Sequence, residues 1–319
     1  MTGTDLISIR DLTAEEVREI LDLALEMKRD PDRHRQALPQ KTLAMIFEKP
    51  SLRTRVSFET GMTQLGGHAI NLGPSDISMG KRERVADVAR TLSGMVDGIM
   101  ARTFSHQAII DLAAHASVPV INGLSDHLHP CQALADFLTV REIFGRCDGI
   151  RLAYVGDGNN VAHSLMYAGA KLGAHVHVAT PPGYAPDPGV VSRARKDAAS
   201  TGGSITVGHD LSAAVDSADV VYTDTWASMG QEAEHDARLK VFRPWQVNAA
   251  VMARAGRRAI FLHCLPAHLG EEVTEEVFES KASVVFQQAA NRLHAQKAVL
   301  VLLMGGGPSR SRARRSDPT

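Results

Sequence analysis

Short apolar runs alternate with helical patterns along almost the whole chain. The runs lie at 42–47, 69–72, 98–101 and 118–121 in the first half, and at 150–155, 176–179, 204–207, 220–223 and 259–262 in the second. Each run has the length and the continuous apolar character of a strand that is buried on both faces. Strands that alternate with helices are typical of parallel sheets, because a parallel connection needs a crossover. The pattern therefore predicts an α/β fold.

The division of the runs into two groups predicts two domains. The segment 144–149, Phe-Gly-Arg-Cys-Asp-Gly, interrupts the alternation, and a chain of 319 residues is long enough for two domains of this kind. We expect two doubly wound parallel-sheet domains joined by helices, with boundaries at 1–145 and 146–288. The helix expected at 289–304 is apolar on several sides, so we expect it to pack back on the first domain. The Gly- and Arg-rich tail at 305–319 is expected to be disordered.

Composition excludes several classes of partner. The net charge of -1 provides no field that would attract nucleic acid or an anionic membrane. No run of about 18 apolar residues is present, and the N-terminal segment lacks the basic and apolar regions of a signal peptide. The three cysteines lie far apart in the sequence, as is usual in a reduced compartment. We expect a cytoplasmic protein with no nucleic-acid or membrane partner.

The motif Ser51-Leu52-Arg53-Thr54-Arg55 lies where the first predicted strand gives way to a helix. The first turn of a helix presents unpaired N–H groups and the positive end of the helix dipole, both of which favour an anion. Guanidinium groups match phosphate oxygens in the same place. The motif therefore predicts a phosphate site without the glycines of a P-loop. The alternative interpretation is an N-cap serine followed by surface arginines.

Polar side chains also follow the other predicted strands. They lie in the segments Arg102-Thr103-Phe104, His129-Pro130-Cys131-Gln132, Asp157-Gly158-Asn159-Asn160, 224–230 and His263-Cys264-Leu265-Pro266. Open parallel sheets bind ligands at the carboxyl ends of their strands. The first half supplies cations and neutral donors, whereas the second supplies a carboxylate, amides, a hydroxyl and a thiol. We therefore expect an active site in the interdomain cleft that binds an anionic group on one side and an amine on the other.

Five of these segments, together with a sixth at 291–297, resemble in the same order the motifs of the aspartate/ornithine carbamoyltransferase family. They lie at 51–55, 102–104, 129–132, 224–230, 263–266 and 291–297, and the resemblance extends from about Ile7 to Leu303. Any one of them is a weak signal, but six in order are specific. The Ser-Met-Gly sequence at 228–230 and His-Cys-Leu-Pro at 263–266 resemble the ornithine enzymes rather than the aspartate enzymes.

The resemblance implies transfer of the carbamoyl group from carbamoyl phosphate to the side-chain amine of L-ornithine, giving L-citrulline and phosphate. It implies a first domain that binds carbamoyl phosphate, a second that binds ornithine, no metal or cofactor, a homotrimer and a place in arginine metabolism. The implied carbamoyl phosphate ligands are Ser51, Leu52, Arg53, Thr54, Arg102, His129, Gln132, Cys264, Leu265 and Arg292. The implied ornithine ligands are Asn160, Asp224, Ser228 and Met229.

Four of these residues are implied to be catalytic. Arg102 and His129, together with Thr54, polarise the carbonyl oxygen, on which charge grows as the tetrahedral intermediate forms. Asp224 and Cys264 position or deprotonate the attacking amine. Taken alone, a cysteine at position 264 is more often a small buried hydrophobe than a reactive thiol.

Several positions depart from the family pattern, among them Leu52 and Ser78, Leu269 in His268-Leu269-Gly270, and the run 287–290. Leu52 replaces a threonine found in many relatives, which removes one hydroxyl from the phosphate site. Ser78 lies where relatives usually carry a glutamine that is expected to reach the phosphate bound by a neighbouring subunit. Ser78 is too short for that contact, so a cation in Lys81-Arg82-Glu83-Arg84 is the candidate replacement.

Four other functions are consistent with parts of the sequence. Transfer to another amine, such as putrescine or an N-acylated ornithine, is disfavoured by the intact Ser-Met-Gly motif. A nicotinamide dehydrogenase is disfavoured because Val161 replaces the third glycine of the dinucleotide fingerprint. A zinc site built from His129, Cys131, His263 and Cys264 lacks chelating spacing, since the last two are adjacent. A non-catalytic relative is disfavoured by the nearly complete set of chemical residues.

Overall fold

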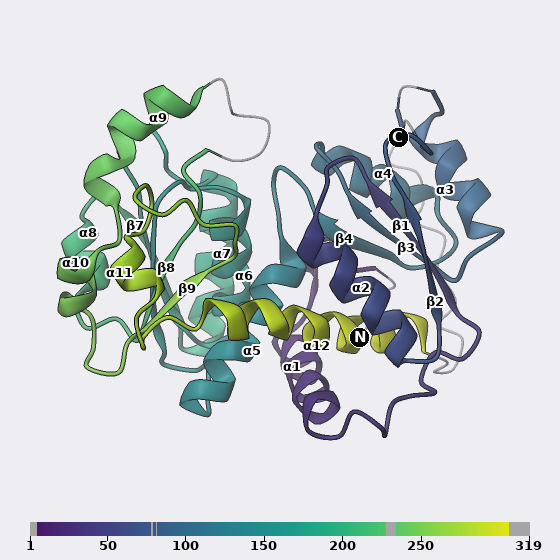
Figure 1. Cartoon of the computed structure of the whole chain (residues 1–319), viewed down its shortest axis with the longest axis horizontal. Coiled ribbons are helices and arrows are strands. Elements are labelled where there is room, and N and C mark those ends of the chain that lie inside the picture. The colour runs from purple at the N-terminus through teal and green to yellow at the C-terminus, as the bar shows by residue number, and fades with distance from the viewer. Residues whose placement is uncertain (1–4, 78, 81, 228–233, 306–319) are drawn as a thin grey trace.

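The computed structural model describes residues 5–77, 79–80, 82–227 and 234–305, and these residues contain nine strands in two parallel sheets. The first sheet has the order β2-β1-β3-β4 and the second the order β7-β6-β5-β8-β9. The strands are β1 (Thr42–Phe47), β2 (His68–Leu72), β3 (Gly98–Arg102), β4 (Val120–Leu124), β5 (Arg151–Val155), β6 (His175–Ala179), β7 (Ser204–Gly208), β8 (Val220–Thr223) and β9 (Ile260–His263). Each of the nine predicted runs overlaps one of these strands. The two sheets lie toward opposite ends of the long axis of the molecule (Figure 1).

One strand differs clearly from its predicted bounds. The run at 118–121 becomes β4, which begins at Val120 and continues to Leu124. Pro119 precedes the strand and has no N–H to donate to the ladder. Asn122 continues the strand because the N-terminal segment pairs with it: its backbone N–H donates to Leu6 O at 2.8 Å, and its side-chain amide donates to Ile7 O at 2.9 Å.

Helices cover both faces of the first sheet. They are α1 (Ala14–Arg29), α2 (Leu52–Gln64), α3 (Val85–Ser93), α4 (His106–His115) and α5 (Pro130–Phe144), after a short helix η1 (Ile9–Asp11). Successive side chains of β1 enter two different cores. Leu43 and Met45 pack with α1, α2 and α5, whereas Ala44 and Ile46 pack with α3 and α4. This alternation explains the continuous apolar run, because a strand between two helical layers has no solvent face.

The second sheet is built in the same way. Its helices are α6 (Asn160–Leu172), α7 (Pro188–Thr201), α8 (Leu211–Val215), α9 (His235–Phe242), α10 (Ala249–Arg254) and α11 (Glu275–Phe278), with a short helix η3 (Arg243–Trp245). Leu152 and Tyr154 of β5 face the core formed with α6 and α7, and Ala153 and Val155 face the other core. The prediction of two doubly wound parallel sheets is confirmed.

Helix α12 (Val285–Met304) joins the two halves and begins four residues before the expected helix at 289–304. It packs against α1, α2 and α5 and also contacts β9. In Figure 1 it runs beneath both halves of the molecule and crosses α5 between them. Among the described residues, no helix has the length and apolar character that a membrane crossing requires.

The strand order fixes where a ligand can bind. The chain reverses its direction of winding between β1 and β3 in the first sheet, and between β5 and β8 in the second. Such switch points open a crevice at the carboxyl ends of the strands. The segments that follow β1, β3, β5, β8 and β9 are the ones in which the sequence places its polar motifs.

Candidate functional site

A cleft of about 1340 Å³ lies between the two sheets. It is lined by residues that follow strands of both halves, among them Ser51, Arg102, His129, Asp224 and Cys264. The predicted position of the active site between the two halves therefore coincides with the large cleft of the described residues.

The first face of the cleft begins at the N-terminus of α2. Ser51 is the N-cap, and its hydroxyl accepts a hydrogen bond from Thr54 N at 3.4 Å. The Thr54 hydroxyl is buried between two guanidinium groups, since Arg102 Nη1 lies 3.5 Å and Arg292 Nη2 lies 3.3 Å from its oxygen. Arg53 is half-buried and also lines the cleft. The N-cap interpretation and the phosphate interpretation of the motif are thus compatible.

The three guanidinium groups of Arg53, Arg102 and Arg292 destabilise one another. Burial, together with the charges of Arg292 and Arg53, lowers the pKa of Arg102 to about 10. Burial also lowers the pKa of Arg53 and of Arg292. The Nε of Arg102 is buried and has no hydrogen-bond partner within the described part of the chain. Buried cations with an unused donor are costly unless an anion completes the site, so this face is suited to bind one.

His129 is held as a neutral imidazole on the same face. Burial is the main cause that lowers its pKa well below the ordinary value, and Arg292, Arg102 and Arg53 lower it further. Its backbone N–H donates to the Ser164 hydroxyl of α6 at 2.7 Å, which ties the start of α5 to the second half. Its Nδ1 is buried and finds no hydrogen-bond partner among the described residues. A neutral imidazole in this position can donate a hydrogen bond to a carbonyl oxygen without adding charge.

Gln132 and Arg292 complete the first face from two different helices. Gln132 lies one turn into α5, and its side-chain oxygen accepts from Arg292 Nη1 at 2.6 Å. Arg292 comes from α12, where its Nε donates to Gln296 at 2.9 Å and Gln296 in turn donates to Ser57 at 2.8 Å. The guanidinium of Arg292 is therefore fixed in the direction of the cleft before any ligand binds.

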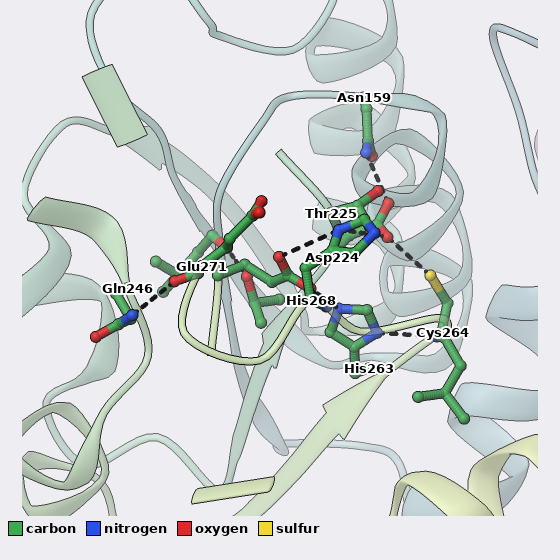
Figure 2. A network of polar contacts seen from close by, with 12 residues as sticks. Asn159, Asp224, Thr225, Gln246, His263, Cys264, His268 and Glu271 are labelled. Carbon is green, nitrogen blue, oxygen red and sulfur yellow. Dashed lines mark hydrogen bonds and ion pairs between the residues drawn. The ribbon is translucent and has the colours of Figure 1, made fainter. Parts of the chain in front are cut away.

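The second face is centred on the carboxylate of Asp224, which follows β8. Its Oδ1 accepts from Thr225 N at 2.8 Å and lies 2.9 Å from Cys264 Sγ, and its Oδ2 accepts from Asn159 Nδ2 at 2.8 Å. Figure 2 shows these three contacts converging on Asp224. Thus β5, β8 and β9 each supply one residue of this cluster from the segment after their last position.

Cys264 is an uncharged thiol. Burial is the main cause that raises its pKa well above the ordinary value, and the negative charge of Asp224 raises it further. The S–H therefore donates to Asp224, as the 2.9 Å separation requires. A thiolate nucleophile needs a lowered pKa, so this environment disfavours covalent catalysis by Cys264.

His263 fixes the turn that carries Cys264. Its Nδ1 accepts from Leu265 N at 2.9 Å, and its Nε2 lies 3.1 Å from Glu272 Oε1. The donor atoms of Asp224, His263 and Cys264 lie within 4.8 Å of one another, which is a spacing that a metal could use. Both ring nitrogens of His263 are already engaged, however, so of these three residues only Asp224 and Cys264 offer a donor, which is fewer than a zinc site uses.

The structure brings most of the predicted site residues together. Ten of them line the cleft: Ser51, Leu52, Arg53, Thr54, Arg102, His129, Gln132, Cys264, Leu265 and Arg292. Asp224 and Asn160 line it as well. Asn160 Nδ2 donates to the backbone oxygen of Ser125 at 2.6 Å, so its amide already bridges the two halves. Ser228, Met229, Ser78 and Lys81 lie outside the described residues.

Other residues of the cleft were not predicted. Asn159, rather than its neighbour Asn160, is the amide that contacts Asp224, and its oxygen also caps α6 by accepting from Val161 N at 2.9 Å. Arg238 of α9 donates to Asp157 at 2.8 Å and to Trp226 O at 3.0 Å. An asparagine before an apolar helical pattern is an N-cap signal that could have identified Asn159. The contacts of Arg238 join segments far apart in the sequence and have no local signal.

Comparison with known proteins gives matches over both halves. A family model described as the carbamoyl-P binding domain of aspartate/ornithine carbamoyltransferase matches residues 4–142, and one described as the Asp/Orn binding domain matches residues 148–303. An ornithine carbamoyltransferase of Thermococcus kodakarensis is 57% identical over 308 residues, which cover 96% of this chain and 98% of that protein.

Relatives from Pyrococcus furiosus give the same result. A protein named ornithine carbamoyltransferase, anabolic, is 56% identical over 308 residues, covering 96% of this chain and 98% of the relative. A solved structure of the ornithine carbamoyltransferase from this organism has a TM-score of 0.92 at 56% identity, over 95% of this chain and 97% of the other. With both family models matched and the strand-end residues gathered in one cleft, the chain belongs to the aspartate/ornithine carbamoyltransferase family.

Proposed function

We propose that the protein transfers the carbamoyl group of carbamoyl phosphate to the side-chain amine of L-ornithine, releasing L-citrulline and phosphate. One observation carries this proposal: three guanidinium groups and a neutral His129 face, across a single cleft, the carboxylate–thiol–amide cluster around Asp224. The names and identities of the relatives support the same reaction.

Carbamoyl phosphate occupies the first face in this proposal. Its phosphate lies against the first turn of α2, where Ser51, Arg53, Thr54 and the backbone N–H groups around Leu52 supply donors. A helix N-terminus and an arginine together suit an oxygen-rich anion. The mutual repulsion of the cations in the free protein is relieved when the dianion binds.

The carbonyl oxygen of the carbamoyl group is polarised by Thr54, Arg102 and His129. Their donors are in place beforehand, and the unpartnered Nε of Arg102 and Nδ1 of His129 indicate unused hydrogen-bonding capacity at this point. Such donors stabilise the oxyanion of the tetrahedral intermediate without reorganisation. Gln132, Arg292 and the backbone oxygens of Cys264 and Leu265 orient the carbamoyl end of the substrate.

Ornithine lies on the second face, with Asn160, Asp224, Ser228 and Met229 as its proposed ligands. The neutral side-chain amine attacks the carbonyl carbon, and a C–N bond forms. The C–O bond to phosphate then breaks and the electron pair leaves with the phosphate. One proton of the attacking nitrogen passes to the departing phosphate, which leaves as the hydrogen phosphate dianion. Asp224, with Cys264 as its hydrogen-bond donor, positions the amine.

We also propose the organisation of the chain that goes with this activity. Residues 1–145, with the C-terminal helix packed on them, form the carbamoyl phosphate-binding domain, and residues 146–288 form the ornithine-binding domain. The protein acts in the cytoplasm, in arginine biosynthesis, as a homotrimer. Exposed Leu52 and Val56, one turn apart on α2, support an apolar contact with another subunit. Light scattering is expected to give about three times the chain mass of 34.4 kDa.

A steady-state assay of citrulline formation tests the reaction. The purified protein is supplied with carbamoyl phosphate and with ornithine, putrescine or N-acetylornithine in turn. We expect ornithine to give the highest kcat/KM by at least about 100-fold, since the other two lack the free amino-acid head or its charge. Equal use of putrescine, or no ureido product from ornithine, contradicts the proposal.

A further inference from the structure

A buried carboxylate lies behind the first face of the cleft and has no role in the reaction steps proposed above. Asp136 is on α5, one turn after Gln132, and is completely buried. Its Oδ1 accepts from Gln132 Nε2 at 2.8 Å and from Gln288 Nε2 at 2.6 Å. Its Oδ2 accepts from the Tyr222 hydroxyl at 3.2 Å.

The first glutamine continues toward the anion site. The Gln132 side-chain oxygen accepts from Arg292 Nη1 at 2.6 Å, and Arg292 Nη2 lies 3.3 Å from the Thr54 hydroxyl. The amide of Gln132 therefore has its nitrogen at Asp136 and its oxygen at Arg292. If the amide were flipped, its NH₂ group would face the guanidinium of Arg292. Both groups are donors, so no hydrogen bond could form between them.

The second glutamine continues toward the other face. The Gln288 side-chain oxygen accepts from the backbone N–H of His263 at 2.9 Å. His263 is the last residue of β9, and the next two residues, Cys264 and Leu265, line the cleft. Gln288 thus holds the end of the strand from which the turn of the second face departs.

Both glutamines obey the same constraint. An ionised carboxylate only accepts hydrogen bonds, so Asp136 forces each amide to present its NH₂ group inward and its oxygen outward. We propose that Asp136 is a positioning residue that sets the orientation of Gln132 and Gln288, and through them aligns Arg292 on the first face with the His263–Cys264–Leu265 turn on the second. This inference deepens the proposed function and rests on it.

The chemistry of the buried group agrees with this geometry. Burial raises the pKa of Asp136 to about 7, while the hydrogen bonds from Gln132, Gln288 and Tyr222 limit the rise. Burial of a carboxyl without an ion pair is costly, and the group retains its acceptor character because three donors converge on it. The Tyr222 hydroxyl also accepts from Gln288 Nε2 at 3.1 Å, so the Gln288 amide is held by hydrogen bonds to both Asp136 and Tyr222.

The test compares a variant that removes both hydrogen-bond paths from Asp136, through Gln132 and through Gln288, with a variant that removes only the path through Gln288. Asp136→Ala removes the acceptor for both glutamines, and we expect kcat/KM for citrulline formation to fall by roughly 30-fold or more at about pH 8. Gln288→Met removes only the arm to His263. We expect it to lower kcat about 10-fold while the Kd for carbamoyl phosphate, measured by calorimetric titration, changes less than about threefold.

A double variant tests whether the two residues act as one unit. If Asp136 acts on the second face through Gln288, Asp136→Ala combined with Gln288→Met is expected to be no more than about twofold worse in kcat than Asp136→Ala alone. Asp136→Asn keeps one acceptor oxygen in nearly the same shape and is expected to recover most of the loss. If the alanine protein does not fold, Gln288→Met remains the test variant, because its expected loss in kcat without a change in the Kd for carbamoyl phosphate does not depend on the alanine protein.

Thr139→Val is the matched control. Thr139 lies on the same helix, is equally buried, and its hydroxyl donates to Ala135 O and accepts from Asn291 rather than joining the Asp136 network. We expect it to lose stability in denaturant titration and to keep kcat/KM within about twofold.

Two results would overturn the inference. One is an Asp136→Ala protein that is destabilised like the control but keeps wild-type kinetics. The other is full additivity of the Asp136 and Gln288 losses. Failure of the proposed function is a separate outcome, since the wild-type protein would then make no citrulline, whereas carbamoyl phosphate titration of Asp136→Ala still reports on the arm through Gln132.

Discussion

The two faces of the cleft are prepared for ligands in different ways. The first face consists of buried side chains, Thr54, Arg102 and Arg292, whose positions are fixed by helices α2, α5 and α12. The second face consists of one carboxylate, Asp224, that is already saturated by neutral donors. Within the described part of the chain, the first face has positive charge without a counterion, whereas the charge of the second is already stabilised by three hydrogen bonds.

This difference indicates which ligand each face can hold tightly. Cations in a desolvated site bind a phosphate dianion strongly, because Coulomb attraction is large where water is excluded. A carboxylate with its hydrogen bonds already made can orient an amine without holding its protonated form strongly, which a nucleophilic amine requires. The variants below test this contrast, beginning with the largest expected effect.

Arg53→Ala should damage the first face most directly. It removes a guanidinium from the anion site, and we expect a loss of at least about 3 kcal/mol in transition-state stabilisation, or roughly 100-fold in kcat/KM. Arg55→Ala is the matched control, because Arg55 lies two residues away on α2 but is exposed and bonded to Glu59 at 2.9 Å. An Arg53→Ala protein with kinetics like those of Arg55→Ala would remove Arg53 from the site.

Asp224→Asn should affect only the second face. The new amide would present its NH₂ group toward either the Cys264 thiol or the Asn159 amide. Both of these groups are donors, so one of the present hydrogen bonds to Asp224 would be lost. We expect KM for ornithine to rise by roughly 30-fold, about 2 kcal/mol, while the Kd for carbamoyl phosphate stays within about threefold. Calorimetric titration measures the second quantity. Equal weakening of both ligands would mean that the two faces are not independent.

Much of the fold could be predicted from the sequence because local patterns carry it. Nine apolar runs gave nine strands, and the polar segments after them lie in one cleft. A strand buried between helical layers leaves a continuous apolar signal, and ligand sites at strand ends follow from parallel topology. The six family motifs then indicated the reaction that the comparisons with relatives support.

The parts that were not predicted depend on contacts between distant residues. Asp136 and Gln288 are 152 residues apart, and neither has a sequence context that indicates a shared hydrogen bond. The predicted run ended at Ile121, but pairing with the N-terminal segment makes Asn122 part of β4. Asn159 and Asn160 are chemically identical neighbours, and only the direction of the first turn of α6 decides that Asn159 meets Asp224.

The protonation of His163 is expected to change the free energy of unfolding, because this side chain joins segments around the cleft. Its Nδ1 donates to His127 O at 2.9 Å and its Nε2 accepts from Asp187 N at 3.0 Å, so protonation would place N–H against N–H. Burial is the main cause that lowers its pKa to about 4. The unfolded chain therefore binds the proton first, and stability is present above about pH 6.5 and is lost as the pH falls toward 4.

The expected loss is measurable by denaturant titration. Between pH 7 and pH 5.5 this one group should lower the free energy of unfolding by about 1 kcal/mol. We expect His163→Gln to be less stable at pH 7 but to show a correspondingly flatter decline. His175→Gln is the control, since His175 lies on β6 and its ring hydrogen-bonds to the Ser204 hydroxyl at 2.9 Å. Equal slopes for wild type and His163→Gln would refute this assignment.

Cys264→Ser should have the smallest effect on kcat/KM. It tests whether the thiol of the second face acts as a hydrogen-bond donor or as a nucleophile. The thiol is protonated and donates to Asp224, and a serine hydroxyl can make the same hydrogen bond. We expect kcat/KM to fall less than about fivefold for Cys264→Ser and about 10-fold for Cys264→Ala, which loses the donor. If Cys264 were a nucleophilic thiolate, kcat/KM would fall much further, by roughly 1000-fold or more for both variants. Because the environment of Cys264 raises its pKa, we expect the milder result, in which the thiol serves Asp224 and the free amine of the substrate is the only nucleophile.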